Sequence, residues 1–148
     1  MKILRIVLFV LHAFIGLGAL AGGLGCLLDP MAPMGAPVSM LEGSPFTSFL
    51  IPGIVLFVLF GIGNVIGAIL SLTKFWGYGA IAGTLGAGMI VWIVVQVVII
   101  DAVTFLHIAY FAIGLVQALA GLFLILKNER CLAILQKLQK ALKKPLQA

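Results

Sequence analysis

The stretch from Trp92 to Gly121 constrains this chain most tightly, because it is a hydrophobic hairpin that only residues 101–104 interrupt. A helix needs about 20 apolar residues to cross the hydrocarbon core of a bilayer. Followed to the ends of their apolar runs, residues 80–100 and residues 105–126 both reach that length. The hairpin therefore predicts two membrane spans joined by a very tight turn.

Composition extends this prediction to the whole chain. Of its 148 residues, 64% are hydrophobic and 9% are charged, which is far more apolar than a soluble domain of this length. Two further apolar runs occupy residues 6–28 and 49–72. The first resembles a signal peptide at its basic start, but its run is long enough to span. The predicted fold is an all-α membrane protein, an antiparallel four-helix transmembrane bundle at residues 1–128 with no separate soluble domain.

The charged residues are distributed unevenly. With four spans, all nine Lys and Arg residues fall on one side of the membrane, beginning with Lys2, Arg5 and Lys74. Three of the four acidic residues fall on the other side, namely Asp29, Glu42 and Asp101. Because cytoplasmic segments carry an excess of Lys and Arg, both termini are predicted to be cytoplasmic.

Residues 129–148 are a basic tail with an apolar stripe at helical spacing. A helix of this kind lies in the headgroup plane, where anionic lipid attracts each cation by about 1 kcal/mol at most. The tail is therefore predicted to be an amphipathic interfacial helix with anionic lipid as its partner. Nucleic acid is not expected as a partner, because its binding needs a cationic face without an apolar one. The predicted headgroup contacts are Lys137, Lys140, Lys143 and Lys144.

Polar residues recur on one face of the predicted spans. In the fourth span, spacings of three and four residues align His107, Tyr110 and Gln117 on one helical stripe with Gly114 and Gly121. Such a stripe faces other helices rather than lipid. The sequence therefore predicts a partly polar seam inside the bundle. Its candidate residues are His12, Asn64, Gln96, His107, Tyr110 and Gln117.

Depth along the helices divides these six residues into two groups. At a rise of 1.5 Å per residue, His12, Asn64 and Gln117 lie roughly 9, 12 and 14 Å from the inner ends of their spans. The other three lie in the outer half. The inner group is interpreted either as interhelical hydrogen bonds worth about 0.6 to 2 kcal/mol each, or as a polar path with the outer group at its mouth.

Three local contacts are also predicted. Residues 39–42 fit a capping box in the loop after the first span. Either Thr104 or Asp101 is expected to cap the fourth span. The indole N–H of Trp92 is expected to meet the amide of Gln96, one helical turn away.

The residue patterns point away from catalysis. Ser71 is the only serine within a predicted span and Asp101 stands alone, so no catalytic triad is visible. The two histidines lack Cys or acidic partners at zinc-ligand spacing. Cys26 and Cys131 are predicted to lie a membrane thickness apart, and without a Cys-x-x-Cys pair thiol redox chemistry has no centre. No acid lies in a span core, which argues against proton-coupled cation exchange. A non-enzymatic protein without a metal or cofactor is therefore expected.

Two segments resemble a known group of proteins. Residues 37–46, Pro-Val-Ser-Met-Leu-Glu-Gly-Ser-Pro-Phe, lead into residues 49–53, Phe-Leu-Ile-Pro-Gly. These residues resemble small four-span bacterial membrane proteins with no assigned activity, as do residues 92–96 followed by Tyr110 and Gly114. The resemblance implies a bacterial inner membrane and supplies no catalytic residues.

Two functions are consistent with these features. The first is a membrane protein that binds a lipid, an apolar ligand or a partner membrane protein through its small-residue helix faces. The second is a small oligomeric carrier that uses the polar seam of His12, Asn64 and Gln117 as its route.

The tail gives the first testable prediction. Replacing Lys137, Lys140, Lys143 and Lys144 with Gln is expected to weaken binding of a tail peptide to anionic vesicles, because it removes the attraction to the headgroups. Vesicle co-sedimentation at low and high salt measures the effect, which should shrink as salt rises. Unchanged partitioning would contradict the prediction of a surface helix.

Overall fold

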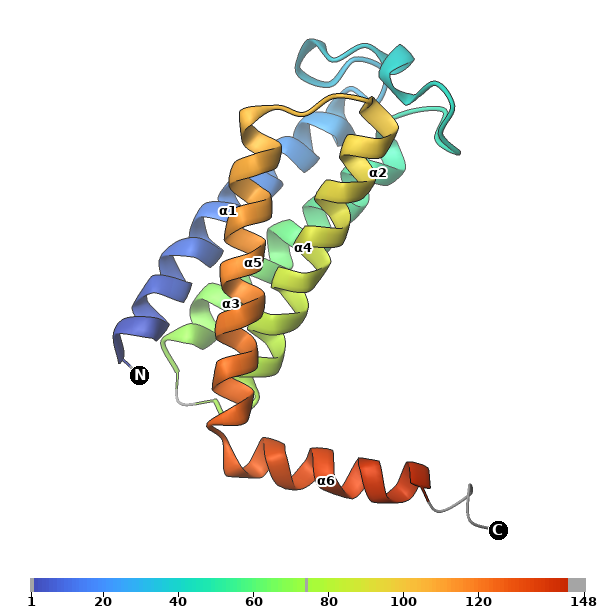
Figure 1. Ribbon diagram of the computed structural model, residues 1–148. Helices are drawn as coiled ribbons and strands as arrows, with labels where there is room; N and C mark the ends of the chain where they lie inside the picture. Colours follow the sequence, from blue (N-terminus) through green and yellow to red (C-terminus); the bar gives the residue numbers. More distant parts are fainter. Residues whose placement is uncertain (1, 74, 144–148) are drawn as a thin grey trace.

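The computed structural model describes residues 2–73 and 75–143 (Figure 1). Within these residues, four helical segments are long and apolar enough to cross a membrane. The first, third and fourth spans are α1 (Lys2–Leu28), α4 (Tyr78–Ile100) and α5 (Phe105–Leu126), and the second consists of α2 (Leu50–Val55), the π-helical segment η3 (Leu56–Ile62) and α3 (Gly63–Ser71). A further helix, α6 (Glu129–Lys143), follows the fourth span. The predicted all-α four-helix fold of a multi-pass membrane protein is confirmed.

The predicted and observed ends of the spans differ by more than one residue at two places. The first helix already begins at Lys2 rather than at residue 6, and the third begins at Tyr78 rather than at residue 80. Lys and Arg favour helix and keep their charged groups in water while their stems cover apolar surface, so a basic start continues the helix. The predictions for Lys74 and Lys144 lie outside the described residues, as do those for the side chains of Cys131, Lys140 and Lys143.

The spans form two helical hairpins. Helix α1 packs mainly against α2, η3 and α3, while α4 packs against α5, and contacts between the two hairpins are sparse. Figure 1 shows the spans side by side, with the 29–49 loop at one end and the N-terminus and α6 at the other. We call these the loop end and the terminal end.

Both hairpins are closed by the same kind of contact between glycine and backbone. A Cβ atom added at Gly16 would lie 3.1 Å from the Val65 nitrogen and 3.4 Å from the Gly61 carbonyl oxygen. In the second hairpin, a Cβ atom at Gly86 would meet the Ala118 nitrogen, and the Gly114 carbonyl oxygen at 2.6 Å.

These contacts show that the hairpins are equivalent. Gly16 and Gly86 are 70 residues apart in the sequence. The residues that they contact correspond in the same way, because Gly61 and Gly114 are 53 residues apart and so are Val65 and Ala118. The returning helices share a short motif, Gly-Ile-Gly-Asn at residues 61–64 and Gly-Leu-Val-Gln at residues 114–117. Because α1 and α4 both run from the terminal end to the loop end, the repeat is parallel.

The core of the bundle is layered along its length. A terminal-side cluster consists of Leu8, Tyr78, Ala82, Ala120 and Leu124. A loop-side cluster consists of Ile15, Ala19, Phe60, Met89 and Ile93. Between them lie the fully buried side chains of His12, Asn64 and Gln117, which we call the polar layer.

Arg5 connects three helices at the terminal end. Its guanidinium donates to the backbone carbonyls of Ser71, at 3.4 Å, and of Thr73. It also lies 5.4 Å from the centre of the Tyr78 ring, within the range of a cation–π contact. The arginine therefore joins α1 to the end of α3 and the start of α4, in addition to its predicted contribution to the charge asymmetry.

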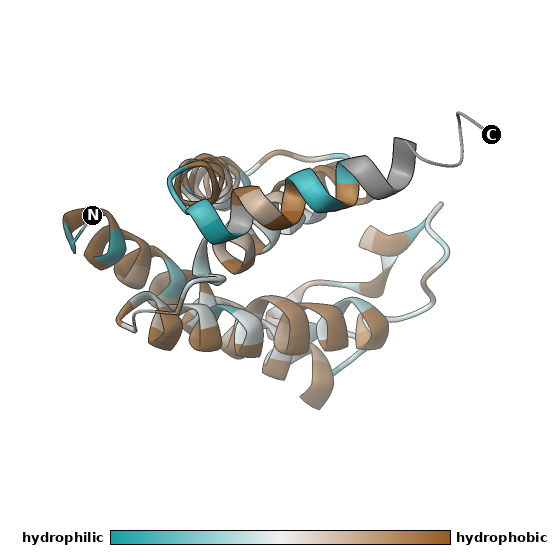
Figure 2. Cartoon of the chain, turned by 90° about the horizontal axis from the view of Figure 1, so that it is seen from below, coloured by the Kyte–Doolittle hydropathy of each residue, from teal (hydrophilic) through white to brown (hydrophobic). Residues whose placement is uncertain are grey.

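Helix α6 runs across the terminal end instead of continuing α5 (Figure 1). The Asn128 side-chain amide donates to the Trp76 carbonyl oxygen at 3.0 Å, and its oxygen accepts from the Arg130 N–H at 3.0 Å. Hydrophilic and hydrophobic residues alternate along α6 in Figure 2, whereas the spans are mostly hydrophobic. Ile134 and Leu138 are 44% and 55% exposed, so the protein leaves this part of the apolar stripe uncovered.

The loop end contains short turns. The loop includes two 3-10 turns, η1 (Pro33–Gly35) and η2 (Val38–Leu41). The predicted capping box at residues 39–42 is wrong, because Pro37 precedes the turn and no side-chain cap forms. In the second hairpin, Thr104 is the N-cap of α5, while Asp101 ends α4 with a positive φ of 51°. An aspartate tolerates this left-handed conformation better than most residues.

The contact at Gly86 leads to a second prediction. Gly86→Ala is expected to destabilise the bundle by about 1 to 3 kcal/mol, because the new methyl group meets backbone atoms that cannot move without separating α4 from α5. The SDS fraction that unfolds the protein in mixed micelles measures the effect. Gly88→Ala is the matched control, since its Cβ would meet only the Phe60 ring, at 3.6 Å. Equal stability of the two variants would contradict the close-contact account.

Candidate functional site

The polar layer brings together side chains from three helices. Asn64 Oδ1 lies 2.7 Å from His12 Nδ1, and Gln117 Nε2 lies 2.8 Å from the same nitrogen and 3.3 Å from Asn64 Oδ1. All three residues are 0% exposed. The sequence-based expectation that these residues lie at one depth is confirmed, and their hydrogen bonds connect the two hairpins.

The π-helical segment helps to orient Asn64. Asn64 Nδ2 donates to the Phe60 carbonyl oxygen at 2.8 Å, and the backbone N–H of Gly63 also donates to this oxygen. The segment ends at Ile62, immediately before Gly63 and Asn64, the two residues that donate to this oxygen. Side chains and carbonyls are displaced where a π-turn inserts an extra residue, and such turns often occur at functional sites.

This orientation assigns the proton of His12. With its nitrogen bonded to Phe60, Asn64 presents only its oxygen to the imidazole ring, so Nδ1–H must donate. A protonated Nδ1 cannot accept from Gln117, and the short Gln117 contact is satisfied best with the glutamine oxygen turned toward the ring. His12 Nε2 is then an acceptor, and it is buried without a partner among the described residues.

The polar layer is packed rather than open. The terminal-side cluster and the loop-side cluster cover its two sides, and the Tyr78 ring lies edge-on to His12 with centroids 6.1 Å apart. Its three residues line neither of the two loop-end cavities described below. This arrangement supports interhelical hydrogen bonding as the role of the inner group.

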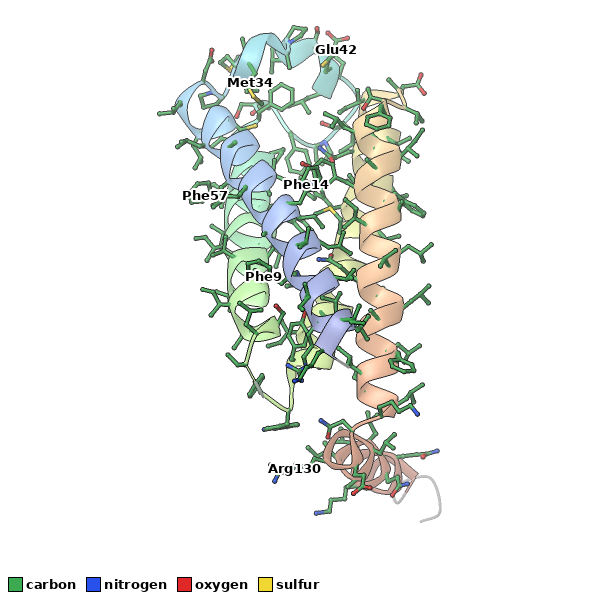
Figure 3. The ribbon with its side chains drawn as sticks, turned by 90° about the vertical axis from the view of Figure 1, so that its left-hand side faces the viewer. Phe9, Phe14, Met34, Glu42, Phe57 and Arg130 are labelled. Atoms are coloured by element: carbon green, nitrogen blue, oxygen red, sulfur yellow. The ribbon has the colours of Figure 1, made fainter. Side chains whose placement is uncertain are left out.

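The first loop-end cavity has a volume of about 240 Å³ and lies under the 29–49 loop. The loop contributes apolar side chains to its wall, and α1, α2, η3 and α4 contribute the remainder. Met34, labelled in Figure 3, comes from this loop and lies against the end of α1. The polar side chains in the wall of this cavity are Cys26, Trp92 and Gln96.

The second loop-end cavity has a volume of about 400 Å³ and lies between α1 and the second hairpin. It contains the outer group of predicted seam residues, Gln96, His107 and Tyr110, together with Trp92 and Thr104. The two cavities adjoin, because they share five wall residues. These are Gly22, Met34, Leu56, Trp92 and Gln96.

Glycines in α1 make room for this second cavity. Gly18 faces the hydroxyl of Tyr110, which occupies the place that a Cβ atom would take. The Tyr110 ring stacks on Phe14 with centroids 5.9 Å apart, and Figure 3 labels Phe14 in the space between α1 and α5. Gly22, four residues further along α1, lines both cavities.

One predicted contact in the cavity is wrong. The Trp92 indole N–H is buried and has no hydrogen-bond partner among the residues described, so it does not bond to Gln96. The indole ring instead packs against Phe60 of the other hairpin, with centroids 5.7 Å apart. Packing between hairpins therefore overrides the contact expected within one helix.

His107 has a structural role that its position in a polar stripe did not indicate. Its Nδ1 accepts from the Thr104 backbone N–H at 3.0 Å and lies 3.1 Å from the Thr104 hydroxyl oxygen. An accepting Nδ1 leaves the ring proton on Nε2. Sequence reasoning also missed the contact of Arg5 with Tyr78, although a cation immediately before the first apolar run was a visible signal.

Metal binding finds no support in the side chains. The described residues contain no group of three or more His, Cys, Asp or Glu side chains placed to hold a metal ion. Comparison with protein families, curated proteins and solved structures found no match. The proposed function therefore rests on the geometry of the polar layer and of the two cavities.

The polar layer leads to a third prediction. Asn64→Leu is expected to destabilise the protein by about 1 to 3 kcal/mol, because it removes the oxygen that accepts from His12 Nδ1–H and the amide that donates to the Phe60 carbonyl oxygen, both in a buried layer. The triple variant His12→Phe, Asn64→Leu, Gln117→Met removes the polar groups together. It should therefore lose less stability than the sum of the single variants.

The SDS fraction at unfolding in mixed micelles measures all four variants. Independent contributions would make the triple loss equal to the sum of the single losses, and that result would contradict a coupled network.

Proposed function

We propose that this protein is a non-enzymatic binder of an apolar, lipid-like molecule, which it holds in the adjoining cavities at its loop end. The cavities carry this proposal, since their volumes of about 240 and 400 Å³ fall near the range of small-molecule sites. Their walls are mostly apolar, with a few polar groups gathered on α4 and α5. This composition suits a ligand that is largely hydrocarbon.

The setting of the second cavity supports the same proposal. Ala21, which lines it, is exposed on the face of a helix apolar enough to cross a membrane. A ligand dissolved in the bilayer would reach such a wall without crossing water. The tight glycine contacts within each hairpin, together with the sparse contacts between hairpins, favour a cleft between the two rigid units.

The alternative is a small oligomeric carrier that uses the polar seam of His12, Asn64 and Gln117. It is favoured by the parallel repeat, because parallel repeats related by an axis along the membrane normal occur in transporters. The complete burial of the three residues argues against it, since a route needs water or substrate beside them. Binding is therefore the better supported proposal.

The cellular setting belongs to the same proposal. The resemblance noted above and the charge asymmetry support a bacterial inner membrane, with the terminal end in the cytoplasm. Helix α6 would then lie on the cytoplasmic headgroups, where its exposed Ile134 and Leu138 enter the interface and Lys137 remains in water. A second copy or a partner membrane protein would cover part of the exposed helix surface.

The binding proposal gives a fourth prediction, tested in the full chain with Trp76→Phe. Only Trp92 then fluoresces, because the sequence contains two tryptophans. The probe is 9,10-dibromo-octadecanol, a neutral chain whose bromine atoms quench indole fluorescence on contact. We expect saturable quenching in detergent micelles, since Trp92 lines both cavities.

A cavity-filling variant and a matched control make this test specific. Ala21→Phe fills the second cavity and is expected to raise the half-saturating probe concentration about tenfold, through lost space for several methylene groups. Leu17→Phe adds a ring on the same helix at a residue that is 68% exposed and lines neither cavity. Quenching that never saturates, or that both variants reduce equally, would contradict the proposed site.

A further inference from the structure

The unsatisfied hydrogen-bond donors of the second cavity indicate what the bound molecule carries at its head. Trp92 Nε1–H is buried and without an acceptor among the described residues. The proton of His107 is on Nε2, because Nδ1 accepts from the Thr104 N–H, and no described residue accepts from Nε2. The Tyr110 hydroxyl, beside Gly18, also makes no hydrogen bond with the described residues.

Burial makes the free Trp92 donor informative. A buried donor without a partner loses its hydrogen bond to water and costs about 1 to 3 kcal/mol. The partly exposed Tyr110 and His107 side chains lie on the wall of the same cavity, so an acceptor inside it would satisfy the buried donor and meet both of them. The start of α5 adds partial positive charge at the same place, since Thr104 is its N-cap.

The charges of the wall narrow the choice of acceptor. No described wall residue of either cavity is acidic, so the site offers no counter-ion for a cationic head. None is Lys or Arg either, which makes the site a poor match for the two charges of a phosphate monoester. A carboxylate has a single charge and accepts several hydrogen bonds, which neutral donors can supply.

The adjoining first cavity provides the place for a chain. Its wall is apolar apart from Cys26 and the shared residues Trp92 and Gln96. A molecule whose head meets His107 and Tyr110 would therefore extend its tail past Trp92 and under the 29–49 loop.

We infer that the loop-end site takes a single-chain amphiphile with a carboxylate head, that is, a fatty acid. The inference rests on the proposed function, which requires only that the cavities hold an apolar molecule. The carboxylate would accept hydrogen bonds from the Tyr110 hydroxyl and His107 Nε2–H, and the hydrocarbon chain would occupy the first cavity.

The test compares two brominated chains on the full-length Trp76→Phe protein in detergent micelles at alkaline pH, where the acid is ionised. The probes are 9,10-dibromostearate and 9,10-dibromo-octadecanol, which differ only at the head. Half-saturation of Trp92 quenching is expected at a concentration of dibromostearate about tenfold lower than that of dibromo-octadecanol, because hydrogen bonds to a charged group are stronger than those to a hydroxyl.

Two variants locate the head. Tyr110→Phe keeps the ring that stacks on Phe14, and His107→Gln keeps a Thr-x-x-Gln capping box at the start of α5. Each is expected to weaken the binding of dibromostearate about five- to tenfold and to leave the binding of dibromo-octadecanol unchanged. Tyr78→Phe is the matched control, since it removes a hydroxyl at the terminal end, away from both cavities, and should change neither affinity.

The outcomes separate the two proposals. Equal, saturable quenching by acid and alcohol would overturn the carboxylate inference and leave the apolar site in place. Absence of saturable quenching by both probes would overturn the proposed function itself. Hexadecyl phosphate displacing the probe at lower concentration than palmitate would overturn the choice of carboxylate over phosphate.

Discussion

Close contact between helix backbones is the constraint on which this bundle depends. Inside a bilayer, apolar side chains gain little by leaving lipid for a protein interior, so helices associate through van der Waals packing and hydrogen bonds. The two hairpins achieve such packing at Gly16 and at Gly86, where the returning helix presents backbone atoms as well as side chains. Each hairpin is consequently tight where these glycines lie, and the second loop-end cavity lies between α1 and the second hairpin.

The polar layer connects these units where apolar packing alone would not select one arrangement. Each hairpin contributes one amide at an equivalent position, Asn64 and Gln117, whereas the position equivalent to His12 in the second hairpin is Ala82. The single imidazole therefore lies between two amides, and its Nδ1 proton is shared across the hairpin boundary. Apolar clusters above and below exclude other partners, which makes the layer a specific point of registration between the hairpins.

The outer half of the predicted seam has a different character from the inner half. Gln96, His107 and Tyr110 line a cavity instead of bonding to one another. Gly18 and Gly22 are the reason for this difference, because the missing side chains leave space where larger residues would have filled the interface. The same stripe of polar residues on α5 thus contributes to a packed layer at Gln117 and to an open wall at His107.

The sequence by itself determined the four spans, the tight turn at residues 101–104 and the faces that carry His12, Asn64 and Gln117. Length, hydrophobicity and helical periodicity act along the chain, so these features need no knowledge of neighbouring helices. The π-helical segment, the packing of Trp92 on Phe60 and the cavities were decided only by tertiary structure. Each depends on how closely two distant segments approach, and that distance is set by glycines and side chains on both partners together.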